Sequence, residues 1–260
     1  MKNEYILVID SGVGGLSILT QMLKLFSSNI VYFADNKHCP YGSHSRAEIL
    51  KFLVEIIDET RKKYRLKIVV LACNTATTSA ISSLRKKYKD LVFVGTEPAL
   101  NLANNLKYKH VLSLTTPVTA AQSKYTVLRN SLSINIKTCA MPCFASNIEQ
   151  NLTNPNILNA LRLKIDMFFI KNHIKNHDCV VLGCTHYGLI KDKISNFIKL
   201  PCIDGSLGVA RQTYKYWLLF QKYQQQKSKI IFCQSSLNSA SKQIYKKILG
   251  QILANSWKLW

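Results

Sequence analysis

The sequence predicts an α/β protein of two similar lobes, each with a parallel sheet flanked by helices. Short apolar segments of β type alternate with segments of helical period along the chain. Such alternation is typical of parallel sheets that are covered on both faces. A length of 260 residues lies near the size at which one core divides into two. A strand that ends in cysteine also occurs twice, at residues 69–75 and 180–186.

The first lobe is expected at residues 1–97 and 208–260, and the second at residues 98–207. Apolar β-type runs predict strands at residues 5–9, 30–34, 68–72, 91–95, 111–114, 134–140, 179–182 and 230–233. Helical spacing of apolar residues predicts helices that begin at residue 16 and span residues 46–63, 77–87, 156–171 and 208–223. Residues 147–156 are polar and predict a loop.

The formal net charge of +21 would suit a protein that binds nucleic acid or an anionic membrane surface. Lysine greatly outnumbers arginine, however, and the lysines are spread along the chain. Nucleic-acid recognition favours the planar fork of arginine and clustered basic residues. We therefore expect a solvated basic surface, with neither a specific nucleic acid nor a membrane as partner. The positive field would attract a small anionic substrate.

The eight cysteines are scattered through the chain, and no pair has the Cys-x-x-Cys spacing of a zinc ribbon or a redox motif. No run of 18 apolar residues and no basic leader is present, which predicts a cytoplasmic protein. Reduced thiols are expected in that compartment. The sequence gives no sign of a bound metal or cofactor.

Cys73 and Cys184 occupy equivalent places at the ends of two buried strands. Residues 69–75 read VVLACNT and residues 180–186 read VVLGCTH, so polar residues follow where a buried strand would continue apolar. Ligands of open parallel sheets bind at the carboxyl ends of the strands. Two similar lobes that face each other would bring the two thiols together.

A pair of thiols suits a reaction that inverts a carbon centre. Exchanging the configuration of an amino acid requires removing the α-proton from one face and returning a proton to the other. A free thiol titrates near about 8.5 and is readily tuned downward, so Cys73 and Cys184 could serve as base and acid. His186 could polarise Cys184 or carry its proton, and Asp10 is the counterpart near Cys73. We interpret the following cysteines as small apolar core residues: Cys39, Cys139, Cys179, Cys202 and Cys233.

A dinucleotide-binding unit is an alternative reading of the first strand and turn. Residues 10–15 read DSGVGG after that strand, and Asp35 ends the second strand. The fingerprint expects a third glycine where Ser17 stands. This alternative also leaves the two cysteine strand ends unexplained.

The sequence resembles the glutamate racemases of the aspartate/glutamate racemase superfamily over nearly its whole length. Four segments carry the likeness in the expected order and spacing: DSGVGGLS at residues 10–17, PYG at 40–42, ACNTA at 72–76 and LGCTHY at 182–187. The resemblance implies that Cys73 and Cys184 are the two bases, assisted by Asp10 and His186. It implies a substrate pocket lined by Asp10, Ser11, Tyr41, Gly42, Asn74, Thr75, Thr119, Thr185 and His186.

The resemblance also implies a substrate and a setting. His186 favours glutamate, because related aspartate racemases usually carry a glutamate residue at that place. The implied fold has two pseudo-twofold related α/β lobes with the site in the cleft between them. No pyridoxal phosphate and no metal are implied, and the product would be D-glutamate for peptidoglycan. A homodimer is left open as the assembly.

One departure from the family pattern concerns the second cysteine. Family members carry a glutamate that supports this cysteine, whereas residues 141–146 read MPCFAS and contain no carboxylate; Glu149 is the nearest one. Two further hypotheses therefore stay open. The chain could keep the fold with weak or lost activity and act as a basic binding module, or it could racemise aspartate or another small acidic amino acid.

Overall fold

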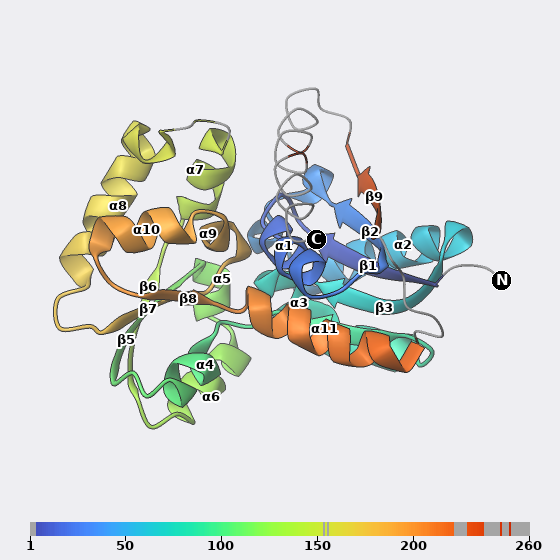
Figure 1. Cartoon of the computed structure of the whole chain (residues 1–260), viewed down its shortest axis with the longest axis horizontal. Helices are drawn as coiled ribbons and strands as arrows, with labels where there is room; N and C mark the ends of the chain where they lie inside the picture. Colours follow the sequence, from blue (N-terminus) through green and yellow to red (C-terminus); the bar gives the residue numbers. More distant parts are fainter. Residues whose placement is uncertain are drawn as a thin grey trace. The chain divides into compact units, whose positions relative to one another are not determined.

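The chain divides into two compact units, residues 1–96 with 206–260 and residues 97–205. The computed structural model describes residues 4–152, 154, 156–220, 228–236, 245 and 250. Figure 1 shows that each unit has its own parallel sheet with helices packed on it. The predicted α/β class is therefore confirmed.

The first unit contains a five-stranded sheet in the order β4-β3-β1-β2-β9, with every pairing parallel. Its strands are β1 (Glu4–Asp10), β2 (Asn29–Ala34), β3 (Arg65–Leu71), β4 (Val92–Gly95) and β9 (Lys229–Gln234). β1 is central and fully buried beyond its first residue, as its apolar run requires. The carboxyl ends of these parallel strands meet at one edge of the sheet.

Helices cover both faces of this sheet. They are α1 (Leu16–Leu25), α2 (Arg46–Lys63), α3 (Asn74–Lys87) and α11 (Ser206–Phe220), with short 3-10 turns η1 (Asn36–His38) and η2 (Tyr41–Ser43). Leu7 and Ile9 of β1 share one core with buried residues of α2 and α3. Helix α2 has the predicted bounds, and Ser45 and Glu48 form a capping box that fixes its start. Residues 221–223 of the predicted last helix lie outside the described residues.

The second unit contains a four-stranded parallel sheet in the order β6-β5-β7-β8. Its strands are β5 (His110–Thr115), β6 (Asn135–Ala140), β7 (Cys179–Leu182) and β8 (Cys202–Asp204). Its helices are α4 (Leu100–Asn105), α5 (Pro117–Ala120), α6 (Ser123–Asn130), α7 (Phe144–Asn151), α8 (Leu161–His173), α9 (Thr185–Leu189) and α10 (Lys191–Ile198), with η3 (Ile157–Asn159) before α8. Strand β8 has only three residues, which left too little pattern to predict it.

The loop predicted at residues 147–156 is wrong in its first half, because α7 continues to Asn151. Phe144 and Ile148 lie four residues apart and are both fully buried in the core of this unit. That packing stabilises a helix whose other side chains are mostly polar. In the described ranges, no helix combines the length and the apolar character needed to cross a membrane.

Candidate active site

The carboxyl edge of the first sheet gathers several predicted site residues. β1 lies between β2 and β3, so Asp10 at the end of β1 is close to Cys73, the second residue after β3. The backbone N–H of Ala72 donates to Ile9 O at 2.8 Å and continues the ladder to this edge. A Cβ on Gly15 would lie 2.9 Å from the Cβ atoms of both Ala72 and Asp10. Only glycine allows the start of α1 to pack this closely.

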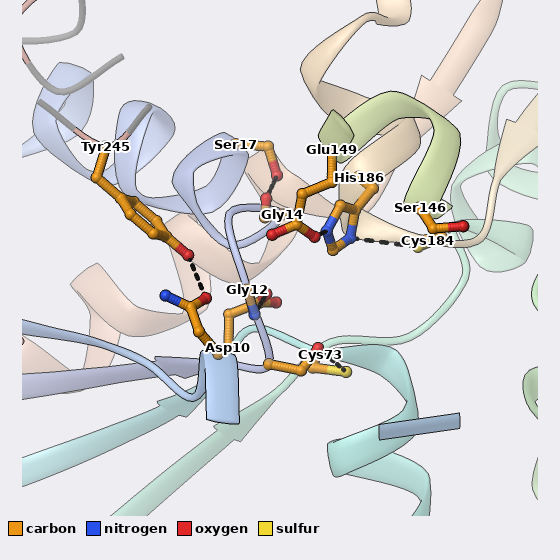
Figure 2. A network of polar contacts seen from close by, with 12 residues as sticks. Asp10, Gly12, Gly14, Ser17, Cys73, Ser146, Glu149, Cys184, His186 and Tyr245 are labelled. Carbon is orange, nitrogen blue, oxygen red and sulfur yellow. Dashed lines mark hydrogen bonds and ion pairs between the residues drawn. The ribbon is translucent and has the colours of Figure 1, made fainter. Parts of the chain in front are cut away.

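Cys73 is buried and has a hydroxyl neighbour. Ser11 Oγ donates to Cys73 Sγ at 3.8 Å, a contact that joins the ends of β1 and β3 (Figure 2). Cys73 is also the N-cap of α3, where the helix dipole presents its positive end. Asn74 and Thr75 follow in the first turn of α3, and both are buried. The carboxylate of Asp10 accepts from the N–H of Gly12 at 2.7 Å and so fixes the turn after β1.

Tyr41 and Gly42 lie in η2, after the neighbouring strand β2. Tyr41 Oη donates to Asp35 Oδ2 at 2.7 Å. Burial raises the pKa of Tyr41, and Asp35, Cys73 and Asp10 raise that pKa further, so the phenol stays neutral and lies near both site residues. His38 Nδ1 lies 2.9 Å from the same Asp35 oxygen. The Asp35 carboxylate is buried by these partners, which argues against the dinucleotide alternative.

The second sheet presents a matching edge. β5 lies between β6 and β7, so the segments that follow these three strands are neighbours. They carry Glu149 on α7, Thr119 on α5 and Cys184 directly before α9. Thr119 is fully buried, and its Oγ1 accepts from Thr116 Oγ1 at 3.0 Å. A Cβ on Gly183 would lie 2.8 Å from Leu114 O, so glycine is required directly before the cysteine.

Cys184 is flanked by an imidazole that is held by a carboxylate. His186 Nδ1 lies 3.9 Å from Cys184 Sγ, and His186 Nε2 lies 2.8 Å from Glu149 Oε2 (Figure 2). Burial alone would lower the pKa of His186, but the hydrogen bonds to Cys184 and Glu149 hold this pKa well above its usual value. The raised pKa favours the charged imidazole, in which both ring nitrogens donate. Thr185 lies between the two residues in sequence and is buried.

Glu149 is the carboxylate whose contact the sequence left undecided. In the structure, the Glu149 carboxylate on α7 lies within hydrogen-bond distance of His186 on α9. Asn147 anchors that helix, since its Nδ2 donates to Asp166 Oδ2 of α8 at 2.8 Å. Asn151 Nδ2 donates back to Asn147 O at 2.9 Å. The signal available in the sequence was the pair of apolar residues, Phe144 and Ile148, that orients α7.

Several of the remaining cysteines have the character of core residues. Burial raises the pKa of Cys179 and of Cys202 to about 12 in each case, and it also raises the pKa values of Cys139 and Cys233. These thiols stay protonated near neutral pH and are poor bases. Over the part of the chain that the structure describes, no group of three His, Cys, Asp or Glu side chains is arranged to hold a metal ion.

The predicted site residues thus fall into two sets, one at the carboxyl edge of each sheet. Asp10, Ser11, Tyr41, Gly42, Cys73, Asn74 and Thr75 belong to the first unit, and Thr119, Cys184, Thr185 and His186 to the second. Each set holds one cysteine with polar neighbours.

Comparison with known proteins gives consistent relatives. No model of a protein family matches the chain. The chain is 35% identical over 220 residues to the glutamate racemase of Clostridium botulinum. This match covers 81% of this chain and 83% of the relative. It is 34% identical over 252 residues to the glutamate racemase of Clostridium novyi, covering 94% of this chain and 96% of the relative.

Among solved structures, the chain is similar to the glutamate racemase of Escherichia coli. The TM-score is 0.80 at 27% identity, and the match covers 96% of this chain and 95% of the other. That protein was crystallised with L-glutamate and an activator, UDP-MurNAc-Ala. The likeness therefore extends over both units of the chain.

Proposed function

This chain belongs to the glutamate racemase family, and we propose that Cys73 and Cys184 carry its reaction as two bases on opposite faces of the substrate. The enzyme is an isomerase that interconverts L- and D-glutamate. The proposal requires the two units to present their cysteine edges to one glutamate molecule. The observation that carries it is that polar groups surround the cysteine at the end of a buried strand in each unit.

The reaction needs one thiolate and one thiol. The thiolate on one side takes the α-proton as the C–H bond breaks, and the electron pair moves into the substrate carboxylate. The thiol on the other side then gives its proton to the opposite face of the α-carbon. The two sulfurs end with exchanged protonation states, so the enzyme is ready for the opposite enantiomer. No cofactor takes part in this scheme.

Neighbouring groups support each sulfur differently in this proposal. The Ser11 hydroxyl donates to Cys73, and the charged His186 stabilises negative charge that develops on Cys184. Glu149 keeps His186 oriented and charged. Asp10 faces the first site as a carboxylate that accepts from the substrate ammonium group.

The substrate carboxylates are bound by neutral donors. Ser11, Tyr41, Gly42, Asn74, Thr75, Thr119 and Thr185 offer hydroxyl, amide or backbone N–H groups. Neutral donors fix the position of glutamate without adding charge beside the sulfurs. The net charge of +21 raises the local concentration of this anionic substrate.

The setting of the reaction follows from the proposed product. We place the enzyme in the cytoplasm, where it supplies D-glutamate for peptidoglycan. Each chain holds both cysteines, so a monomer or a homodimer would be complete.

Circular dichroism of the enzyme with L-glutamate tests the proposal. The signal should decay to zero, and Cys73→Ser and Cys184→Ser should each abolish the decay. Cys143→Ser is the matched control, because this cysteine is exposed and should leave the rate unchanged. Activity that survives in both Cys73→Ser and Cys184→Ser would rule out the two-thiol mechanism.

A further inference from the structure

Helix α8 of the second unit exposes a row of large apolar side chains. They are Leu161, Ile165, Phe168 and Phe169, with 73%, 60%, 48% and 43% of their surface exposed. Their spacing of four and three residues places them on one side of the helix. The opposite side is already apolar and packs in the core through Leu163, Met167 and Ile170. A helix with one solvated face normally carries polar residues there. We call the exposed row the α8 face.

Basic side chains border the α8 face on both sides. Lys164 and Lys171 are exposed along one border, and Arg162 is exposed along the other. The acidic residue of this helix, Asp166, is turned toward α7, where it accepts from Asn147. The surface that α8 offers to solvent is therefore apolar at its centre and positive at its margins.

We propose that the α8 face docks on an anionic lipid surface. An apolar helix face with basic margins is the pattern of helices that lie in the headgroup region of a membrane. The apolar side chains would enter the acyl boundary while the lysine and arginine chains reach the phosphate layer. The net charge of +21 attracts the whole molecule to such a surface.

Other occupants fit the α8 face less well. Nucleic acid would contact the basic margins but would leave Leu161, Ile165 and both phenylalanines in water. A second copy docked through the same face would bring two sets of basic margins together, and like charges oppose that contact. An anionic lipid surface matches both the apolar centre and the positive margins.

This proposal departs from the sequence expectation that the protein has no membrane partner. That expectation was based on lysines scattered along the chain, whereas folding places three basic residues around one apolar row. The contact is peripheral, in keeping with the absence of a membrane-spanning helix from the described ranges. It is also independent of the racemisation chemistry, because none of the α8 face residues belongs to the candidate site.

Vesicle co-sedimentation of the full chain tests the proposal. Binding is expected to phosphatidylcholine vesicles that contain phosphatidylglycerol and not to phosphatidylcholine alone. Ile165→Ser and Phe168→Ser should each weaken binding by about tenfold, because each removes a large apolar side chain from the bilayer boundary. Lys164→Gln and Lys171→Gln should each weaken it by about fivefold.

Matched controls separate this surface from general stickiness. Val127→Ser on α6 and Leu106→Ser after α4 remove exposed apolar residues of the same unit and should leave vesicle binding unchanged. All six variants should racemise glutamate at the parent rate without vesicles, which shows that they are folded. Equal binding to both vesicle types, or full binding by Ile165→Ser and Phe168→Ser, would overturn the proposal. Light scattering that shows a dimer lost in these two variants, without vesicle binding, would assign the face to a second copy instead.

Discussion

The two cysteine strand ends have the same topology but different chemical surroundings. Cys73 follows β3, is buried and accepts from a hydroxyl group of Ser11. Cys184 follows β7, is half-buried and contacts a charged imidazole that is tied to a carboxylate. A shared strand-end pattern therefore fixes where the sulfurs lie, while the neighbouring segments decide which polar groups contact each sulfur.

The difference has a structural origin in the segments that supply the partners. Ser11 belongs to the turn after β1, the strand beside β3, so this contact is built into the sheet edge. Glu149 comes from α7, which is held to α8 by the Asn147–Asp166 hydrogen bond. The Cys184 end therefore depends on a longer chain of contacts and should be the easier one to perturb.

The largest effect is expected when either cysteine is replaced by alanine, and the two variants should differ in the enantiomer that they still deprotonate. Cys73→Ala and Cys184→Ala should each slow racemisation by about a thousandfold, because each removes a positioned proton-transfer group. Each variant keeps one base and should still exchange the α-proton of one enantiomer with D2O. Proton NMR of L- and D-glutamate should show that the two variants exchange opposite enantiomers. If both variants exchanged the same enantiomer, Cys73 and Cys184 would not act on opposite faces of the substrate α-carbon.

A smaller effect is expected from the carboxylate behind His186. Glu149→Gln should lower kcat/KM by about tenfold to a hundredfold, since it removes a group that orients the imidazole. The equilibrium constant between enantiomers is one, so kcat/KM must fall equally in both directions. The difference between the two proton transfers should appear in the kinetic isotope effect measured with α-deuterated glutamate. This isotope effect should rise only for the enantiomer that Cys184 deprotonates. Glu55→Gln on the exposed side of α2 is the control.

The pH profile should distinguish the two ends further. The pKa of His186 is raised in the folded enzyme, so its charged form and the stability of its ion pair are present at low and neutral pH. Both are lost as pH rises through the raised pKa. Glu149→Gln removes one cause of the raised His186 pKa, so the alkaline limb of the kcat–pH profile should move to lower pH. An unchanged limb would show that His186 does not control it.

The smallest expected effect concerns the anchor of α7. Asn147→Ala breaks the hydrogen bond to Asp166 and should cost about 1 kcal/mol of unfolding free energy, measured by urea denaturation. It should lower kcat only a few-fold, because α7 keeps its buried Phe144 and Ile148. A loss as large as that of Glu149→Gln would place the anchor itself in the reaction.

The sequence predicted where the two strands before Cys73 and Cys184 end, because their signal is local. A buried parallel strand reads as a continuous apolar run, and the polar residues after Cys73 and Cys184 mark where each run stops. The helical spacing of apolar residues made the bounds of α2 equally readable. Such features depend on neighbours in the chain and need no knowledge of the fold.

Contacts between distant segments could not be predicted in the same way. Residues 147–151 look like a polar loop until Phe144 and Ile148 are seen to enter the core, so the sequence could not assign the contact between Glu149 and His186. The α8 face was hidden for a related reason. Apolar residues lie on both sides of α8, and only the folded unit shows which of them enter the core and which remain exposed.

A crystal structure of the enzyme with D-glutamate bound would test the two-base account most directly. The decisive quantities are the distances from the substrate α-carbon to Cys73 Sγ and to Cys184 Sγ. The account predicts that both are about 3–3.5 Å, with the sulfurs on opposite faces of the carbon. A substrate with one sulfur out of reach, or with both on the same face, would contradict it.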